Sequence, residues 1–561
     1  MFTLDYILWI ALIITACAFI FSGIDDLFFD IVYWGYFLVR KIKPDPRDHI
    51  GYETLLAIPE QKIALIIGCW QESNVIENMV RYNLSNIDYI NFAIFIGVYP
   101  NDKETLREAR RMEKTYNNVH CVINKTNGPT NKADNLNSIY QAITQFEKRK
   151  KELFSIIVMH DPEDLIHFLS FKLYNYLIPK APMVQIPILP LERKLQNAIY
   201  WSYCDEFAEL HTKDLVVREL INGFVPSAGV GTGFDRHTLD LMSKNKNGLP
   251  FGTTTLTEDY STSLQLHLLM QKVKEKRKPV FTMKYIERVQ TCRPWFYFGK
   301  RKFKKTSSLV ATRALFPQSY RAAVRQRSRW TLGIVFQEWK HTGWPGKLST
   351  LFFIAHDRKA IFTHFFGGFS YLLFFYWFGV FIYSDFFSYT ITLDYFFLKT
   401  PWAWNLIIIT FCIMVNRILQ RSIATYRIYG FIPGVTAVFR TLVSNTINMH
   451  SFFKAFLQFF QSKKRPEKAK WAKTKNTFPV HAQLLPTGRR LGDILIEKKL
   501  VTSKEIIVAL EEQKTSQKKL GEILLGKKIL TESELYSALS ELYNTEGRFT
   551  SSAGSRSLIE T

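Results

Sequence analysis

The sequence predicts an integral membrane protein of the α/β class: a doubly wound α/β domain between transmembrane helices, and a small all-α repeat domain near the C-terminus. Three observations predict this fold. Long apolar runs flank a soluble middle region, short apolar strands alternate with helices inside that region, and a 29-residue repeat with a helical pattern follows it. A chain of 561 residues is long enough for roughly two to four such units.

Three uncharged apolar runs are long enough to cross a bilayer, which takes about 20 residues. They lie at residues 6–23, 361–384 and 400–416, the last continuing past Arg417 to residue 419. We assign a transmembrane anchor to residues 1–23 and a membrane region to residues 346–460. The third run is the shortest, so a buried core helix is its alternative.

Basic residues orient these runs, because positively charged flanks stay on the cytoplasmic side. No lysine or arginine precedes the first run, and basic residues follow it or flank the other two: Arg40, Lys41, Lys43, Arg47, Arg358, Lys359, Arg417, Arg421 and Arg427. The middle and C-terminal regions are therefore expected in the cytosol. Residues 14–18 resemble a cleavage site, but without a positive start we favour an uncleaved anchor.

Two further apolar stretches are interrupted by charges. Asp30 interrupts residues 27–39, and Arg440 and Lys454 interrupt residues 428–460. We expect both to be helices lying along the membrane surface, the first within an amphipathic juxtamembrane segment at 24–59. Two additional spans are the alternative.

The net charge points to an anionic partner. Lys and Arg number 73 and Asp and Glu 49, which leaves a formal charge of +24. Since the excess follows the membrane flanks and the phosphate-binding motifs below, we expect no nucleic-acid partner. The six cysteines form no CxxC pair, which argues against a zinc ribbon or a disulfide scaffold.

The middle domain, at 60–345, begins with strands separated by helical segments. The strands are expected at residues 63–67, 92–98, 119–123 and 155–159. This alternation predicts a parallel sheet, whose ligands bind beyond the carboxyl ends of the strands.

An acidic cluster follows the fourth strand at such an end. Asp161, Glu163 and Asp164 lie within four residues, and their charges repel unless a cation neutralises them. Oxygen ligands suit Mg²⁺ or Mn²⁺, especially with phosphate oxygens completing the shell. A solvated acidic loop is the alternative.

Four further motifs follow a fixed order along the chain. Lys132 lies in a polar turn, a loop of small residues spans 226–234, Thr257-Glu258-Asp259 supplies a carboxylate pair, and residues 325–330 place arginines beside a tryptophan. Small residues let a ligand approach the backbone. Each motif alone is weak.

Together these motifs resemble the processive, membrane-bound family 2 glycosyltransferases, such as cellulose and hyaluronan synthases. Those enzymes carry a lysine loop, a D-x-D metal motif, a TED motif and Q-x-x-R-W in this order. Here the order is Lys132, Asp161-Pro162-Glu163-Asp164, Thr257-Glu258-Asp259 and Gln326-Arg327-Ser328-Arg329-Trp330. The resemblance implies a GT-A-type domain.

The resemblance also implies a role for each residue, and the chemistry fits. Asp259, with Glu258, takes the proton of the acceptor hydroxyl as it attacks the anomeric carbon, which inverts that carbon. Asp161, Glu163 and Asp164 hold Mg²⁺ or Mn²⁺. Gln326, Arg329 and Trp330 complete the catalytic set, with Arg329 hydrogen-bonded to the phosphates. The remaining residues bind substrates: Glu72, Asp102, Lys132 and Asp161 the nucleotide-sugar donor, and Gly231, Thr232, Gly233, Phe234 and Trp330 the growing glycan acceptor.

The sequence departs from the family in two places. The first loop, at 68–73, lacks the usual Pro and Asn, and the metal motif has Pro162 where a close relative more often has alanine. Proline fixes the backbone angle there and either rigidifies the loop or alters the ligand geometry.

A basic linker at 461–485 leads to an internal repeat at 486–545, followed by a Ser/Gly-rich tail at 546–561. Residues 490–495 recur as 519–524. Each copy has a capping box at the same offset, formed by Thr502 with Glu505 and by Thr531 with Glu534. The pair predicts a compact helical module, for which dimerisation or docking is the general interpretation.

The repeat resembles the MshEN domain, which binds cyclic-di-GMP through two such motifs. The matching residues are Arg490, Leu491, Gly492, Leu495, Leu500, Leu510, Gln513, Lys519, Leu520, Gly521 and Leu524. The second copy departs at its polar ends, where Lys519 replaces arginine and Leu542 replaces glutamine. Lysine provides only a point charge, so a module that keeps the fold without binding is the alternative.

The combination resembles the phage-adsorption protein B family (NfrB) of bacterial inner membranes. The resemblance implies an exopolysaccharide synthase activated by cyclic-di-GMP, using a UDP-hexose or UDP-N-acetylhexosamine and an outer-membrane partner. Two alternatives stay open. One is a catalytically silent cyclic-di-GMP-sensing scaffold, and the other is a non-processive lipid glycosyltransferase.

Overall fold

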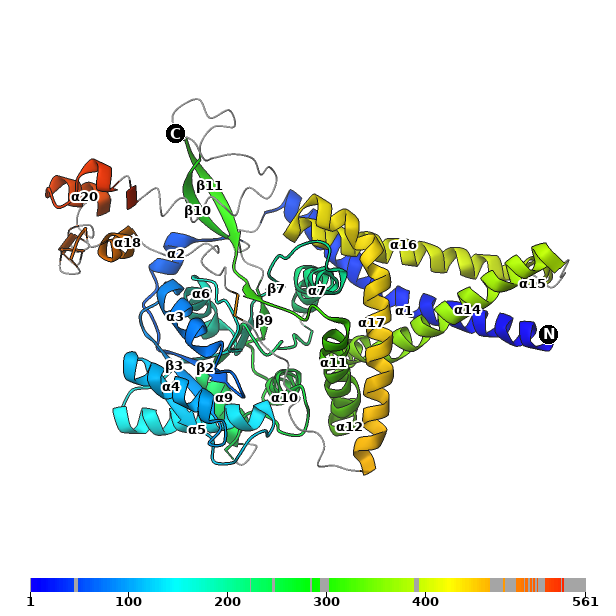
Figure 1. Cartoon of the computed structure of the whole chain (residues 1–561), viewed down its shortest axis with the longest axis horizontal. Helices are drawn as coiled ribbons and strands as arrows, with labels where there is room; N and C mark the ends of the chain where they lie inside the picture. The colour runs from blue at the N-terminus through cyan, green and yellow to red at the C-terminus, as the bar shows by residue number, and fades with distance from the viewer. Residues whose placement is uncertain are drawn as a thin grey trace.

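The structure is a computed structural model. It describes residues 2–44, 49–221, 223–244, 248–282, 285–292, 302–387, 393–464, 478–479, 491–498, 500–502, 505–506, 508–509, 512, 520–535 and 537–538. Figure 1 shows an α/β body on one side and three long helices, α1, α14 and α16, extending from it on the other.

A seven-stranded sheet forms the centre of the α/β body, in the order β4-β3-β2-β5-β8-β6-β9. Its strands are β2 (Ile63–Gly68), β3 (Phe92–Val98), β4 (Val119–Ile123), β5 (Ile156–His160), β6 (Met183–Gln185), β8 (Thr232–Asp235) and β9 (Val280–Phe281). The four strands expected from the sequence are present and parallel. β8 runs antiparallel to both β5 and β6, so the sheet is mixed.

Helices cover both faces of this sheet, and the central strands are therefore buried on both sides. Alternate residues of β2 enter two hydrophobic cores, Ile63 and Leu65 in one and Ala64 and Ile66 in the other. The first core is closed by α3 (Ile76–Asn86), α4 (Lys103–Thr115) and α6 (Ser170–Leu177), the second by α5 (Lys132–Lys150), α9 (Arg236–Lys244) and α10 (Glu258–Lys272).

Smaller elements complete the body. β7 (Ile188–Pro190) pairs with β12 (Thr312–Ala314), and β1 (His49–Gly51) pairs with the hairpin β10 (Tyr285–Cys292) and β11 (Lys302–Leu309). The remaining helical elements are α2 (Tyr52–Leu56), η2 (Ile178–Lys180), α7 (Ala198–Glu209), the π-helical η3 (Leu210–Asp214), α8 (Leu215–Leu220), α11 (Tyr320–Trp330), the π-helical η4 (Thr331–Gln337) and α12 (Glu338–Thr342).

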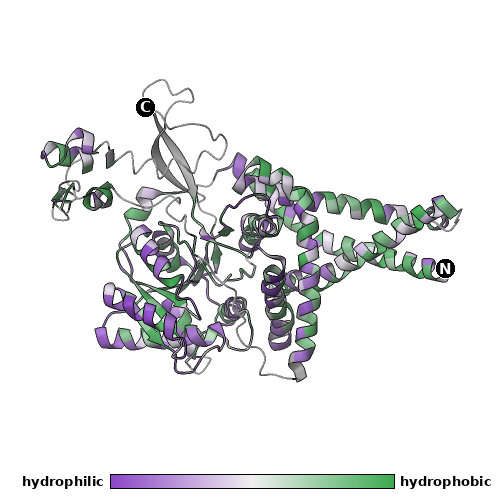
Figure 2. Cartoon of the chain, viewed as in Figure 1, coloured by the Kyte–Doolittle hydropathy of each residue, from purple (hydrophilic) through white to green (hydrophobic). Residues whose placement is uncertain are grey.

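Within the described residues, three helical segments are long and apolar enough to cross a membrane: Leu4–Ile42, Leu348–Phe387 and Trp402–Tyr429. They comprise α1 (Phe2–Ile42), α13 (Leu348–Arg358) with α14 (Ala360–Phe387), and α16 (Trp402–Tyr429); α15 (Leu393–Lys399) lies between the last two. The first two contain the predicted runs at 6–23 and 361–384, and the third contains the run at 400–416 except for its first two residues. Figure 2 shows that their long extensions are mostly hydrophobic, whereas α4 and α5 carry many hydrophilic residues.

Two helices are longer than the sequence suggested. α1 continues unbroken through residues 27–39, and α17 (Phe431–Lys464) is one helix that covers residues 431–460 of the stretch expected at 428–460. Two of the charges in these stretches have partners in the α/β body or in another long helix. Asp30 accepts hydrogen bonds from Lys213 and Asn416, and Arg440 pairs with Asp205.

The C-terminal module is described in part. α18 (Leu491–Glu497) and α20 (Leu520–Gly526) occupy equivalent places in the two copies, and a shared apolar core includes Leu495 and Leu524. Both capping boxes form: the Thr502 amide donates to Glu505, and the Thr531 amide donates to Glu534. The structure therefore agrees with a two-copy helical repeat.

Candidate active site

The predicted motifs converge on one cavity of about 530 Å³. It opens beyond the carboxyl end of β5, where the sequence placed the ligand. Glu72 lines it together with residues from all four motifs: Lys132, Asp161, Glu163, Asp164, Glu258, Asp259, Gln326, Arg329 and Trp330.

Lys132 connects three parts of this cavity. It lies at the start of α5, whose N-cap is Asn131. Its Nζ is 2.5 Å from Asp161 Oδ1 and 3.7 Å from Glu258 Oε1, and it donates to the Gly229 carbonyl oxygen at 3.4 Å. Burial opposes the ammonium form, but the Asp161 and Glu258 carboxylates raise the pKa of Lys132 above its ordinary value. It therefore provides a permanent positive charge.

Glu258 and Asp259 open helix α10 beneath the small-residue loop. Burial raises the pKa of Glu258 to about 7, with Lys132 opposing this shift. Burial also raises the pKa of Asp259, again against Lys132. Asp259 Oδ1 accepts the Tyr260 backbone N–H at 2.8 Å. This carboxylate is held in place and has a raised proton affinity, which suits a general base.

Gly229 allows the loop to approach Asp259. Its φ is +78°, and a Cβ there would lie 2.7 Å from Asp259 Oδ2. Any side chain at this position would be strained and would press on the carboxylate. The cavity-lining part of the loop is therefore Pro226, Ser227, Ala228, Gly229 and Val230.

The residues expected to bind the acceptor in this loop lie elsewhere. Gly231 is not among the cavity-lining residues, and Thr232, Gly233 and Phe234 form β8 inside the sheet. Thr232 donates to Gln185 at 2.7 Å, and Phe234 is fully buried in the second core. The loop returns into the sheet earlier than the residue pattern indicated, so the structure corrects these four assignments. Trp330 does line the cavity.

The residues of the acidic cluster have two different roles. Asp161 and Glu163 line the cavity. Asp164 also borders it, but its Oδ2 is engaged by His160 Nδ1 at 2.9 Å and by the Asp161 amide at 3.0 Å. Asp164 thus fixes the turn that presents Asp161. His160, which the sequence reading did not single out, is its fully buried partner.

The cluster suits a cation that is also bound by substrate. Burial, followed by the charges of Asp161, Asp164 and Glu72, raises the pKa of Glu163 well above its ordinary value. A divalent cation would relieve this repulsion. No set of three or more His, Cys, Asp or Glu side chains is arranged to hold a metal within the described part of the chain. Asp161 and Glu163, which both line the cavity, provide oxygen ligands that suit a divalent cation whose shell phosphate oxygens would complete.

The two donor residues near the first strands differ in position. Glu72 is buried and lines the cavity. Asp102 is not among the lining residues; it caps α4 by accepting from the Thr105 amide and also accepts from the Gln71 amide. Asp102 therefore shapes the loop that carries Glu72.

The Gln326–Trp330 motif lies at the junction of α11 and η4. Gln326, Arg329 and Trp330 line the cavity, and Trp330 packs against Tyr203 and Phe207. Arg327 points elsewhere: its guanidinium donates to Glu206 at 2.8 Å, Asn448 at 2.6 Å and Ser202 at 3.0 Å. It joins the motif to α7 and α17.

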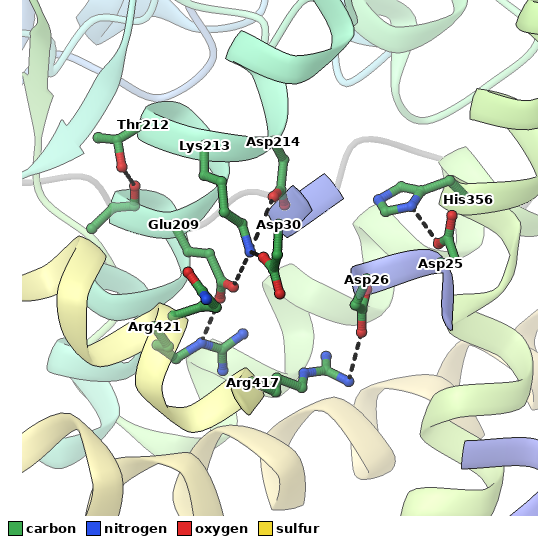
Figure 3. A network of polar contacts seen from close by, with 12 residues as sticks. Asp25, Asp26, Asp30, Glu209, Thr212, Lys213, Asp214, His356, Arg417 and Arg421 are labelled. Atoms are coloured by element: carbon green, nitrogen blue, oxygen red, sulfur yellow. Dashed lines mark hydrogen bonds and ion pairs between the residues drawn. The ribbon is translucent and has the colours of Figure 1, made fainter. Parts of the chain in front are cut away.

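A second set of charges connects the body to the long helices. Figure 3 shows Lys213 of η3 between Asp30 of α1 and Glu209, at 2.6 and 3.0 Å. Arg421 of α16 reaches Glu209 at 2.9 Å, and Asp25 accepts from His356 at 2.6 Å. Asp30 and Arg421 on candidate membrane helices thus have partners in η3 and α7 of the α/β body, and Asp25 pairs with His356 of α13.

The described residues assigned to cyclic-di-GMP lie in or beside the module's apolar core. Gly492 and Gly521 are related by the repeat: a Cβ on either would meet a leucine of the other copy, Leu520 or Leu491, at 3.7 and 3.6 Å. Leu495 and Leu524 are fully buried, and Leu500 packs against the core. Arg490, Leu510, Gln513, Lys519 and Leu542 lie outside the described residues.

Comparison with known proteins agrees with this site. Residues 59–333 match the family model described as "Glycosyltransferase like family 2". The chain is 34% identical over 502 residues to bacteriophage adsorption protein B of Escherichia coli (strain K12), and equally to bacteriophage N4 adsorption protein B of Escherichia coli O157:H7. The match covers 88% of this chain but 65% of each relative's length.

A solved structure shows a more distant similarity. It is the mannosyltransferase PcManGT from Pyrobaculum calidifontis with GDP-Man and Mn²⁺, 11% identical, with a TM-score of 0.38 over 80% of this chain and 100% of that one. The stronger matches are those in sequence. Residues 59–333 therefore match the model of the glycosyltransferase-like family 2, in a chain that is similar to bacteriophage adsorption protein B.

Proposed function

We propose that the protein is a processive, inverting glycosyltransferase that builds an exopolysaccharide from a nucleotide-diphospho-sugar at the bacterial inner membrane. The donor class is a UDP-hexose or UDP-N-acetylhexosamine. The observation that carries this proposal is the convergence of Lys132, Asp161, Asp259, Arg329 and Trp330 on one cavity next to helices that could span a membrane. An outer-membrane partner completes the export route.

Different residues of the cavity act on the donor and on the acceptor in a single displacement. Lys132 and Arg329 offset the charge of the leaving pyrophosphate. Asp161 and Glu163 would hold a divalent cation, which supplies further charge neutralisation at the same phosphates. Asp259 accepts the proton of the acceptor hydroxyl as that oxygen attacks the anomeric carbon. The acceptor ring rests on Trp330, whose flat face is typical of sugar contacts. One displacement inverts the anomeric carbon.

The direct test measures UDP release by the full chain reconstituted in lipid, with a panel of UDP-sugars. We expect release with one sugar. A chelator is expected to abolish it, because Asp161 and Glu163 are anionic and only the cation that they would hold can offset the charge of the pyrophosphate. Added Mg²⁺ or Mn²⁺ restores the rate. Release that is unaffected by the chelator would contradict the metal assignment, and no release with any UDP-sugar would contradict the proposed donor class.

Activity is expected to rise with pH. Burial raises the pKa of Glu258 to about 7 and raises that of Asp259. Protons bound to this pair at low pH prevent Asp259 from accepting another. The initial rate should therefore increase as the pH rises through the range in which this pair of carboxyl groups loses its protons. Glu258→Gln, which removes the neighbouring charge, should move the profile to lower pH, and a flat profile in the wild type would argue against Asp259 as the base.

We propose further that cyclic-di-GMP activates the enzyme through the C-terminal module. The paired helices, the two capping boxes and the placement of Gly492 and Gly521, each near a leucine of the other copy, support the two-copy arrangement on which this proposal depends. A ligand regulates only if it favours one arrangement of the module over another.

Two variants test this regulation. Cyclic-di-GMP is expected to bind the full chain and raise the rate of UDP release, because Arg490 can grip a phosphate or stack on a guanine. Arg490→Ala should weaken binding, whereas Arg81→Ala, which removes a surface arginine of α3, should not. A rate response that survives deletion of residues 486–545 would refute the regulatory role.

A further inference from the structure

The π-helical turn η3 lies between two cavities. Leu210 and His211 line the candidate active site. Lys213 and Asp214 line a separate pocket of about 180 Å³ beside α1, α14 and α16. Figure 3 shows that Lys213 is held there by Asp30 and Glu209. π-Helical turns are frequent at functional sites. In this turn, Lys213 is fixed by its ion pairs on one side, and His211 borders the cavity on the other.

His211 has a hydrogen-bonding capacity that the described residues do not use. Its side chain is fully buried, and neither ring nitrogen has a hydrogen-bond partner among them. Burial lowers the pKa of His211 to about 3. The ring is therefore neutral at physiological pH, with one donor and one acceptor nitrogen. Leaving such a buried group unpaired costs about 1–3 kcal/mol.

Other lining residues share this feature. Thr257 Oγ1, Gln326 Oε1 and Arg218 Nε are also buried and without partners within the described chain. Phe207 links His211 to the aromatic wall: its ring centroid is 5.5 Å from that of His211 and 6.1 Å from that of Trp330. Neutral hydrogen-bonding groups beside aromatic faces, here His211, Thr257 and Gln326, suit a ligand with many hydroxyl groups.

We propose that His211 is an acceptor-binding residue that hydrogen-bonds a hydroxyl group of the glycan beside Trp330. The inference rests on the proposed function and adds a residue to its acceptor site. The glycan is the appropriate ligand because the charged residues assigned to the nucleotide diphosphate and its cation, Lys132 and Asp161, form a separate cluster with each other. His211 offers no charge to a phosphate or a metal ion.

The test compares His211→Leu with His211→Gln in the full chain in lipid. The probes are UDP and a panel of α- and β-linked tetrasaccharides of glucose and N-acetylglucosamine, with binding followed by tryptophan fluorescence. We expect at least one glycan to bind the wild type. His211→Leu should weaken that binding about fivefold to tenfold, the size of one lost hydrogen bond. His211→Gln should restore most of it, and UDP binding should stay unchanged.

His267 provides a matched control. It is also a buried histidine whose pKa burial lowers, to about 4. Its Nε2 is 3.0 Å from Thr350 Oγ1, however, and it does not line the cavity. His267→Leu should leave glycan binding unchanged.

Each outcome decides the proposal. Unchanged glycan binding in His211→Leu, together with a raised melting temperature, would show that His211 is only an unsatisfied core residue. Failure of every glycan to bind the wild type would also overturn the proposal, and UDP release would then show whether the glycosyltransferase proposal stands. Glycan binding that depends on His211, with no UDP release from any donor, would support this inference and contradict the proposed function.

Discussion

Asp259→Asn is expected to reduce sugar transfer by at least about a hundredfold, the usual contribution of a general base. Asparagine keeps the side-chain shape and its Oδ1 can still accept the Tyr260 amide, which Asp259 accepts at 2.8 Å. It cannot take a proton from the acceptor hydroxyl. UDP binding should stay unchanged, because the phosphate-binding charges of Lys132 and Arg329 remain. The measurement is UDP release and polymer formation with the donor that the wild type selects.

Asp240→Asn is the matched control. It makes the same chemical change on α9, where Asp240 pairs with Arg236 and is not among the cavity-lining residues. We expect nearly wild-type transfer. If Asp259→Asn retained full activity, the base would lie elsewhere. Because the protein would still transfer sugar, this result would not support the catalytically silent alternative.

Arg440→Ala is expected to lower the free energy of unfolding by about 3–5 kcal/mol, the cost of breaking a buried ion pair. Arg440 Nε and Nη2 each lie 2.7 Å from an Asp205 carboxylate oxygen, and both residues are buried. The pair joins α17 to α7. Removing the arginine leaves a buried charge that loses its main partner. Thermal unfolding in lipid measures the effect.

Two controls separate this mechanism from a general loss of packing. Arg81→Ala breaks an exposed pair with Glu77 and should cost less than about 1 kcal/mol. Arg440→Met combined with Asp205→Leu should recover most of the stability, because apolar side chains then fill the site. Burial raises the pKa of Asp205 even with Arg440 present.

The pH dependence of the stability of Arg440→Ala follows from the raised pKa of Asp205. Without Arg440, the folded state takes up a proton at Asp205 more readily than the unfolded state does. Stability of the variant therefore rises as pH falls, and its deficit relative to the wild type should shrink from about pH 8 towards pH 5. A deficit that is constant over this range would point to lost packing instead.

The motifs could be predicted from sequence because each is local. Strands β2 to β5 are short apolar runs with helices between them, and the capping boxes at Thr502 and Thr531 depend on residues three positions apart. The position of a ligand beyond the carboxyl end of β5 follows from parallel-sheet topology. These features require no knowledge of distant contacts.

The partners of individual charges could not be predicted in the same way. The sequence shows three adjacent carboxylates at Asp161–Asp164, but only the fold commits Asp164 to His160. It shows arginines at 327 and 329, and only helix packing turns Arg327 towards Glu206 while Arg329 faces the cavity. Asp30 reads as a helix interruption until Lys213, 183 residues away, is placed beside it.

The sequence by itself predicted the domain order and identified the family 2 motifs, the apolar runs and the two-copy repeat, because these depend on local composition and spacing. Only the tertiary structure decided where the small-residue loop re-enters the sheet, which carboxylates face the cavity, and that His211 borders it without a partner among the described residues. Burial and pairing are set by contacts between segments far apart in the chain, and those contacts decide which polar groups remain free to bind substrate.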